Sequence, residues 1–198
     1  SVGSMNQKKE ITSGAIRIAT RTSIEPTAWN YETLDISTDE AITKLEANAL
    51  DKALEGFKKA AKLDEKNTLY LELSNNVLQL ANTFYAQGIT FFEGEKYETA
   101  IESFDKASLA NEVIDIVDTM TIYATALSAS NGGINEIAKV KYAKLIEMQY
   151  NNASIYSELA SVYKAEEDFD KAEEILALGR TKFPDNNGIL IAEINILL

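Results

Sequence analysis

One pattern of small and aromatic residues occurs twice in the chain with the same internal spacing, and this repetition limits the folds that the chain can adopt. The matching steps are Gly88, Phe91, Ala100, Phe104 and Ala107 in the first copy and Ala160, Tyr163, Ala172, Leu176 and Gly179 in the second. A weaker copy between them offers Ala126, Ala138 and Tyr142. A unit that recurs along a chain predicts an array in which each unit packs on the next.

The alanine step of this pattern gives the length of the unit. Ala138 follows Ala100 by 38 residues, and Ala172 follows Ala138 by 34 residues. The first interval is therefore longer by about one helical turn. The phrases EKYETA at 95–100 and EDFDKA at 167–172 both place an aromatic residue and an acid before the alanine. Such a phrase is typical of a turn that leads into a helix.

Hydrophobic periodicity predicts three helix pairs. They are expected at 68–92 with 97–110, at 112–130 with 134–149, and at 153–165 with 169–182. Asn152 and Asp168 are expected to cap the helices that follow them. Flanking helices are predicted at 38–62, after a capping box that begins at Ser37, and at 189–198.

The first part of the chain has no single period. The alternation of IRIATRTSI at 16–24 favours a strand, whereas the apolar residues from Ile11 onward also fit a helical stripe. Trp29 is an aromatic residue that could hold an extended segment on a neighbouring surface. We therefore expect an N-terminal leader at 1–33, extended or partly ordered, followed by a helical repeat domain at 34–198.

The repeated units resemble the tetratricopeptide repeat (TPR) family, whose helix-turn-helix of about 34 residues carries small and aromatic residues at fixed steps. The unit at 153–186 matches best, through Tyr156, Leu159, Ala160, Tyr163, Ala172, Leu176, Gly179 and Pro184. The unit at 81–114 matches through Phe84, Gly88, Phe91, Ala100, Phe104 and Ala107, and the unit at 115–152 is weaker. The resemblance covers about residues 50–198 and implies an all-α fold, a superhelical stack of antiparallel helix hairpins (an α-α solenoid).

In the TPR family, the first helix of each hairpin lines a concave groove that holds an extended peptide or a partner helix. The resemblance assigns this role to Asn82, Tyr85, Ile89 and Phe92 in one hairpin, to Met120, Tyr123 and Leu127 in the next, and to Ser157, Ser161 and Lys164 in the third. It implies a non-catalytic scaffold for protein–protein interactions.

The predicted groove helices carry almost no positive charge. The stretches 67–95, 107–138 and 145–163 contain neither lysine nor arginine. The lysine, arginine and asparagine clamp with which chaperone-binding members of the family hold a C-terminal carboxylate therefore cannot form here. With acids such as Asp118 and Glu158 nearby, the groove is expected to prefer apolar or basic peptides. The formal net charge of −12 also disfavours nucleic acid as a partner.

This sequence lacks two of the residue types on which many enzymes depend. The chain contains no cysteine and no histidine, which removes thiolate nucleophiles, cysteine-ligated zinc and the commonest general base. The acids between Glu166 and Glu174 could serve a carboxylate-based hydrolase, but they span a turn and a helix start, where acids are favoured by the helix dipole. We therefore expect no catalytic residue, no metal and no cofactor.

The final segment ILIAEINILL is more apolar than a solvent-facing cap requires. Either this helix docks on the third hairpin as a capping helix, or the chain is a module of a longer repeat protein, or the helix mediates a homo-oligomer. We expect one of the last two. The basic and apolar residues of 1–33 also allow an alternative in which the groove is filled by the chain's own N-terminal segment. No run reaches the roughly 18 apolar residues of a membrane span, and no signal peptide is seen, so a soluble protein of unknown compartment is expected.

Overall fold

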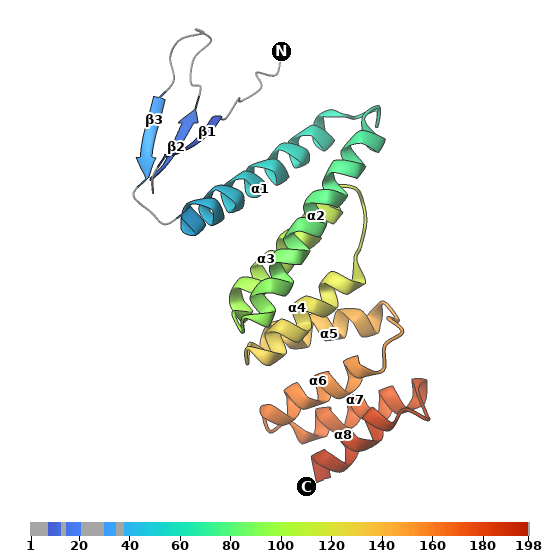
Figure 1. Ribbon diagram of the computed structural model, residues 1–198. Helices are drawn as coiled ribbons and strands as arrows, with labels where there is room; N and C mark the ends of the chain where they lie inside the picture. The colour runs from blue at the N-terminus through green and yellow to red at the C-terminus, as the bar shows by residue number, and fades with distance from the viewer. Residues whose placement is uncertain (1–7, 13–14, 21–29, 35–37, 198) are drawn as a thin grey trace. The chain divides into compact units, whose positions relative to one another are not determined.

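Three short strands precede eight helices in the part of the chain that the structure describes, namely residues 8–12, 15–20, 30–34 and 38–197. The computed structural model is drawn in Figure 1, with its elements labelled in chain order. The chain divides into two units, residues 1–55 and residues 56–198. Helix α1 (Thr38–Leu63) crosses this boundary and contributes residues to both units.

The N-terminal unit contains a three-stranded antiparallel sheet in the order β1-β2-β3. Its strands are β1 (Lys8–Thr12), β2 (Ala15–Thr20) and β3 (Asn30–Leu34). Ile16 of β2 is the partner of Ile11 in β1 and of Leu34 in β3. The alternation that favoured a strand here is the two-residue period of extended chain, so the strand interpretation agrees with the structure and the helical one does not. Trp29 and the capping residue Ser37 lie outside the described residues.

The helical unit contains the three predicted helix pairs (Figure 1). They are α2 (Tyr70–Glu93) with α3 (Tyr97–Glu112), α4 (Thr119–Asn131) with α5 (Asn135–Glu147), and α6 (Ser154–Ala165) with α7 (Phe169–Lys182). Helix α8 (Asn187–Leu197) follows. From α2 to α8 each helix packs against the next, and α8 also packs against α6. This consecutive packing confirms the predicted fold class for the unit, a stack of helix hairpins.

The longer repeat interval lies mainly in α3, and α4 begins later than predicted. Helix α3 has 16 residues where α5 has 13, so the additional turn is helical. The sequence pattern favoured a helix from residue 112, but Asp115 has a φ of +58°, which ends helical geometry. Asp118 then caps α4 by accepting a hydrogen bond from the Met120 amide. The apolar residues between Asp115 and Asp118 therefore belong to a loop.

The turns inside the three hairpins share one backbone conformation. Each contains a residue with positive φ, namely Glu95 (+56°), Gly133 (+69°) and Glu167 (+61°). These residues are separated by the same two intervals as the packing alanines. The left-handed region costs a residue with a β-carbon roughly 1–2 kcal/mol. Glycine suits the second turn for this reason, whereas the two glutamates occupy a strained position.

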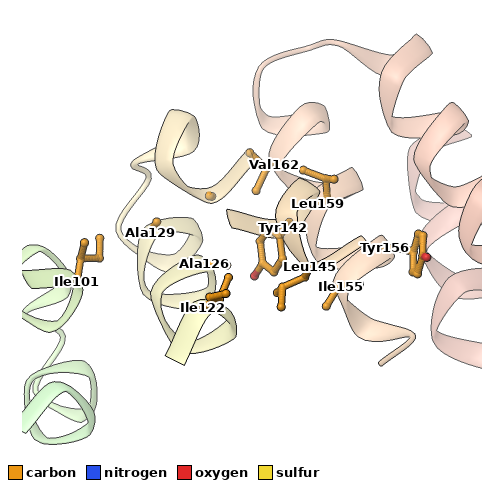
Figure 2. Packing of buried hydrophobic residues seen from close by; sticks show 11 residues of the cluster. Ile101, Ile122, Ala126, Ala129, Tyr142, Leu145, Ile155, Tyr156, Leu159 and Val162 are labelled. Atoms are coloured by element: carbon orange, nitrogen blue, oxygen red, sulfur yellow. The ribbon is translucent and has the colours of Figure 1, made fainter. Parts of the chain in front are cut away.

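The largest buried cluster among the described residues joins the second hairpin to the third (Figure 2). Tyr142 and Leu145 of α5 are fully buried and lie between residues of α4, such as Ile122, and residues of α6, such as Ile155 and Leu159. The packing alanines of the repeat are all inaccessible to solvent: Ala100, Ala126, Ala138, Ala160 and Ala172. Small side chains at these steps let neighbouring helices approach closely, as the repeat pattern predicts.

Candidate functional site

The ten predicted groove residues lie on α2, α4 and α6, the first helix of each hairpin. Helix α4 packs between the two hairpins that flank it and also makes direct contacts with α6. Residues from all three hairpins can therefore contribute to one surface of the helical unit. The contacts of the individual side chains show which of them are available to a ligand and which are used by the fold.

A cavity of about 260 Å³ brings three of the predicted residues together. Asn82 and Tyr85 reach it from α2, and Met120 reaches it from the first turn of α4. Its polar walls are completed by Asn111, Asp118 and Thr121. We call this space the Asp118 cavity. It lies where α2, the C-terminal end of α3 and the start of α4 meet.

Among the residues that the structure describes, Asp118 is the one charged residue that lines this cavity. Its carboxylate accepts a hydrogen bond from the Met120 amide at 2.9 Å and one from the Thr121 hydroxyl at 2.5 Å. An ionised carboxylate offers about four acceptor positions, so both oxygens retain further acceptor capacity. Burial raises the pKa of Tyr85, and the Asp118 charge raises it further. The tyrosine hydroxyl is therefore neutral and lies in the electrostatic field of the carboxylate.

Asn111 adds a polar group that the fold leaves unpaired. The residue is 6% exposed and lies in the last turn of α3, at the wall of the Asp118 cavity. Its side-chain oxygen Oδ1 is buried and has no hydrogen-bond partner among the residues that the structure describes. Leaving a buried acceptor unpaired costs roughly 1–3 kcal/mol. A ligand that supplied a donor to this amide would recover part of that free energy.

A second polar cluster joins α4, α5 and α6. The Tyr123 hydroxyl donates to Glu158 Oε1 at 2.9 Å, and the Tyr123 and Tyr142 rings make an edge contact with centroids 6.5 Å apart. Burial raises the pKa of Glu158, and the hydrogen bond from Tyr123 opposes this shift. The Tyr142 hydroxyl and Glu158 Oε2 are also buried, and neither has a hydrogen-bond partner within the described chain.

Tyr150 links this cluster to the Asp118 cavity. It lies in the loop between α5 and α6, and its hydroxyl donates to the sulfur of Met120 at 3.3 Å. Its ring lies 6.2 Å from the ring of Tyr123. Neither Tyr150 nor Asn111 is among the ten groove residues that the repeat pattern predicts. Both lie outside the first helices of the hairpins, and the signal that could have found them is a polar or aromatic residue at the end of a packed second helix.

The third hairpin offers less to a ligand than the first two. The hydroxyl of Ser157 donates to the Ser154 carbonyl, and the hydroxyl of Ser161 donates to the Ser157 carbonyl, so both donors are used within α6. The ammonium group of Lys164 donates to the Asn195 carbonyl of α8. The single cation among the ten predicted residues is therefore held by the C-terminal helix.

The remaining predicted residues are largely packing residues. Ile89 and Phe92 pack against a buried cluster that includes Ala100 and Phe104, and the Phe92 ring also contacts the ring of Tyr97 at 5.8 Å. Leu127 is half-buried on α4. These three side chains pack below the surface, whereas Asn82 and Met120 are exposed and Tyr85 is half-buried.

The acids at the turn of the third hairpin have structural partners. Glu166 pairs with Lys139 at 2.9 Å, and this hydrogen bond lowers the pKa of Glu166. Asp168 caps α7 and pairs with Lys171 at 2.5 Å, which lowers the pKa of Asp168. A catalytic acid requires the opposite shift. Within the described ranges, no group of histidine, cysteine, aspartate or glutamate could hold a metal ion.

Two other hollows of the helical unit contain none of the ten predicted residues. One, of about 410 Å³, is lined by the end of α1 and by α3, including Lys58, Lys62 and Leu109. The other, of about 400 Å³, lies between α7 and α8 and includes Arg180 and Glu193, which form an ion pair. No helix in the described part of the chain is long and apolar enough to cross a membrane.

Comparison with known proteins supports the interpretation of the helical unit at the level of the fold. No family model matches the chain, and no curated protein matches it. Among solved structures, the TPR domain of OM64 from Arabidopsis superposes with a TM-score of 0.53 and 12% sequence identity, over 61% of this chain and 96% of that domain. With the three stacked hairpins and the buried alanine steps, this likeness confirms the resemblance predicted from the sequence: the helical unit has the fold of a tetratricopeptide repeat domain.

Proposed function

We propose that this protein is a protein-interaction scaffold that binds an extended peptide or a partner helix along the surface formed by α2, α4 and α6. The observation that carries the proposal is the Asp118 cavity, where Asn82 and Tyr85 of one hairpin meet Met120 of the next. A repeat protein binds through surfaces that successive units build together. The Asp118 cavity is such a surface, because residues of two successive hairpins line it together.

The charge of this surface supports an apolar or basic partner. Helices α2 and α4 contain no lysine or arginine, and the one cation predicted on α6 is held by the Asn195 carbonyl. Asp118 and Glu158 place carboxylates along the same helices. Electrostatic complementarity favours a positively charged segment, chiefly through faster association and selectivity.

The test introduces charge at two exposed positions of the groove. The double variant Asn82→Lys, Met120→Lys places two cations at the mouth of the Asp118 cavity, and Met120 is 52% exposed, so the fold should tolerate it. A partner recovered by affinity purification from cells of the source organism is expected to be lost from this variant because the like charges repel it.

The matched control is Val140→Lys on α5. Val140 is 64% exposed and lines none of the three hollows described above. The same partner should be retained by this variant. Retention by the groove variant, or equal loss from both variants, would contradict the proposal that the partner binds along α2, α4 and α6.

Self-association through α8 is a second candidate function that one observation favours. Ile191 and Ile194 are 57% and 58% exposed on a helix whose other side packs against α6 and α7. An exposed apolar pair on a terminal repeat helix is suited to a second copy of the chain. This candidate concerns a different surface from the groove, so both can hold together.

A further inference from the structure

We propose that the Asp118 cavity receives the cationic side chain of one lysine or arginine of the bound peptide. The inference rests on the proposed function, because it assigns one peptide position to one place in the groove. It adds the chemical identity of that side chain. Four features of the cavity favour such a side chain: its size, the charge around it, the character of its walls and the unpaired amide of Asn111.

The size of the cavity suits one side chain. Its volume of about 260 Å³ is several times the roughly 30 Å³ that a water molecule occupies in the liquid. It is smaller than the roughly 300–1,000 Å³ of pockets that enclose small-molecule ligands. A long side chain of an otherwise surface-bound peptide fits these limits better than a free metabolite does.

The charge around the cavity selects a cation. Asp118 is the one charged residue among the described residues that line it, and the stretches 67–95 and 107–138, which supply all of these residues, contain no lysine or arginine. The positive end of α4 offsets part of the Asp118 charge, whereas the negative end of α3, at Asn111, has no basic residue in its last turn. An acidic side chain would be repelled, and a neutral one would leave the charge of the carboxylate without a cation beside it.

The walls suit the aliphatic part of such a side chain. The ring of Tyr85 and the thioether of Met120 line the same cavity as Asp118. Lysine and arginine place their methylene groups along apolar surface while the charged group reaches polar partners. An aromatic face within about 6 Å of the charge also attracts it. Tyr85 can therefore contribute both packing and electrostatic attraction.

Asn111 provides an acceptor that the fold does not use. Its buried Oδ1 has no partner among the described residues, and the residue lines the same cavity as Asp118. An ammonium group donates up to three hydrogen bonds and a guanidinium group up to five. A cation that bonds the Asp118 carboxylate keeps further donors, so a turn of the Asn111 side chain toward the cavity would give its buried oxygen a partner as well.

The test begins with selection of randomised dodecapeptides, displayed on phage, against the intact chain. Enriched sequences are expected to share a lysine or arginine at one position. In synthetic peptides measured by isothermal titration calorimetry, replacing that lysine by norleucine, or that arginine by citrulline, should weaken binding by about tenfold or more. Exchanging lysine for arginine in the same peptide shows which cation the cavity prefers.

Asp118→Asn identifies the residue that recognises the cation. Asparagine caps helices as well as aspartate does, so α4 should keep its start while the charge is removed. The roughly tenfold difference in affinity between the lysine peptide and the norleucine peptide should fall below about threefold in this variant. The matched control is Asp168→Asn, which changes the cap of α7 in the same way but lies outside the cavity and should leave the difference intact.

Each outcome decides between the two proposals. If no peptide is enriched, both groove binding and the assignment of the cavity are wrong. If peptides bind but share no cation, or if Asp118→Asn and Asp168→Asn have equal effects, groove binding stands and the assignment is wrong. Salt dependence tests the assignment without any variant: rising salt should weaken the binding of the lysine peptide and leave the binding of the norleucine peptide nearly unchanged.

Discussion

Gly88→Ala tests the close approach of α2 and α3 on which the first hairpin depends. A β-carbon added at Gly88 would lie 2.5 Å from Cε1 and 2.6 Å from Cδ1 of the Phe104 ring. Ordinary contacts of this kind begin at 3.4 Å. Phe104 is 1% exposed and also contacts the ring of Tyr85, with centroids 5.3 Å apart. The phenyl ring would therefore have to shift by close to 1 Å within a filled core.

Two opposing effects set the magnitude. Alanine favours the helix over glycine by about 1 kcal/mol. Inserting a methyl group into a packed core costs about 1–3 kcal/mol, and the short distances to a rigid ring place this substitution in the upper part of that range. The expected net loss in the free energy of unfolding is about 1–2 kcal/mol. For a chain of this length, that corresponds to a decrease in Tm of roughly 3–6 °C.

The assay is thermal and urea unfolding followed by circular dichroism, with Gly56→Ala as the control. Gly56 lies within α1, and its added β-carbon would meet no atom within 4 Å beyond its chain neighbours and the helix's own backbone, so this change should cause no loss of stability. The double variant Gly88→Ala, Phe104→Leu should recover most of the loss, because the third hairpin pairs Ala160 with Leu176 at the same steps. A Gly88→Ala protein as stable as the Gly56→Ala control would refute the close packing inferred here.

Three further predictions concern a turn, a buried acid and the terminal helix. Glu167→Gly should raise the free energy of unfolding by up to about 1 kcal/mol in urea, because glycine adopts the φ of +61° without strain; a loss would show that the glutamate side chain matters more than the backbone. Burial raises the pKa of Glu158, so the folded state binds more protons than the unfolded state just above the ordinary value of 4.5. The free energy of unfolding should therefore fall as pH rises above 4.5, and Glu158→Gln should abolish this fall. The measurement is a series of urea titrations at different pH, and an equal dependence on pH in the wild type and the variant would contradict the prediction. Ile191→Glu with Ile194→Glu should convert an oligomer into a monomer in sedimentation equilibrium, and a wild-type protein that is already monomeric would exclude self-association through α8.

The stacking of the hairpins was predictable from the sequence because it depends on contacts between residues at fixed spacing. Alanine at 100, 138 and 172 can be identified without coordinates, and each is fully buried where a neighbouring helix approaches. Asp168 was also predictable as a cap, since its carboxylate accepts a hydrogen bond from the Lys171 amide three residues later. Local spacing determines both features, and tertiary context does not override it.

The start of α4 was less predictable, because the apolar residues after α3 continue a helical pattern that the backbone does not follow. Ile114 is buried although it lies in the loop, so its burial contributes to the core without any helical turn around it. Hydrophobic periodicity cannot distinguish a buried loop residue from a buried helix residue. The positive φ at Asp115 is the conformational reason for the break.

The Asp118 cavity could be predicted only in part. Asn82, Tyr85 and Met120 follow from the repeat register, because each occupies an equivalent face of a first helix. Asn111 enters the site from the end of a second helix, and its place there depends on the additional turn in α3. The length of that helix moves one amide to the cavity wall, and the repeat register does not include it because that register assigns groove residues to first helices.

The three hairpins therefore contribute unequally to recognition, although they share one architecture. In the third hairpin the hydroxyls of Ser157 and Ser161 are used by the α6 backbone, and Lys164 is bound to α8. Between the first and second hairpins, by contrast, a carboxylate and a buried amide retain unused acceptor capacity beside an exposed thioether. Polar groups without partners are where a ligand gains most, because its donors replace no existing hydrogen bond within the protein. Selectivity for a partner should accordingly arise at the junction of α2 and α4, while α6 contributes mainly surface for contact.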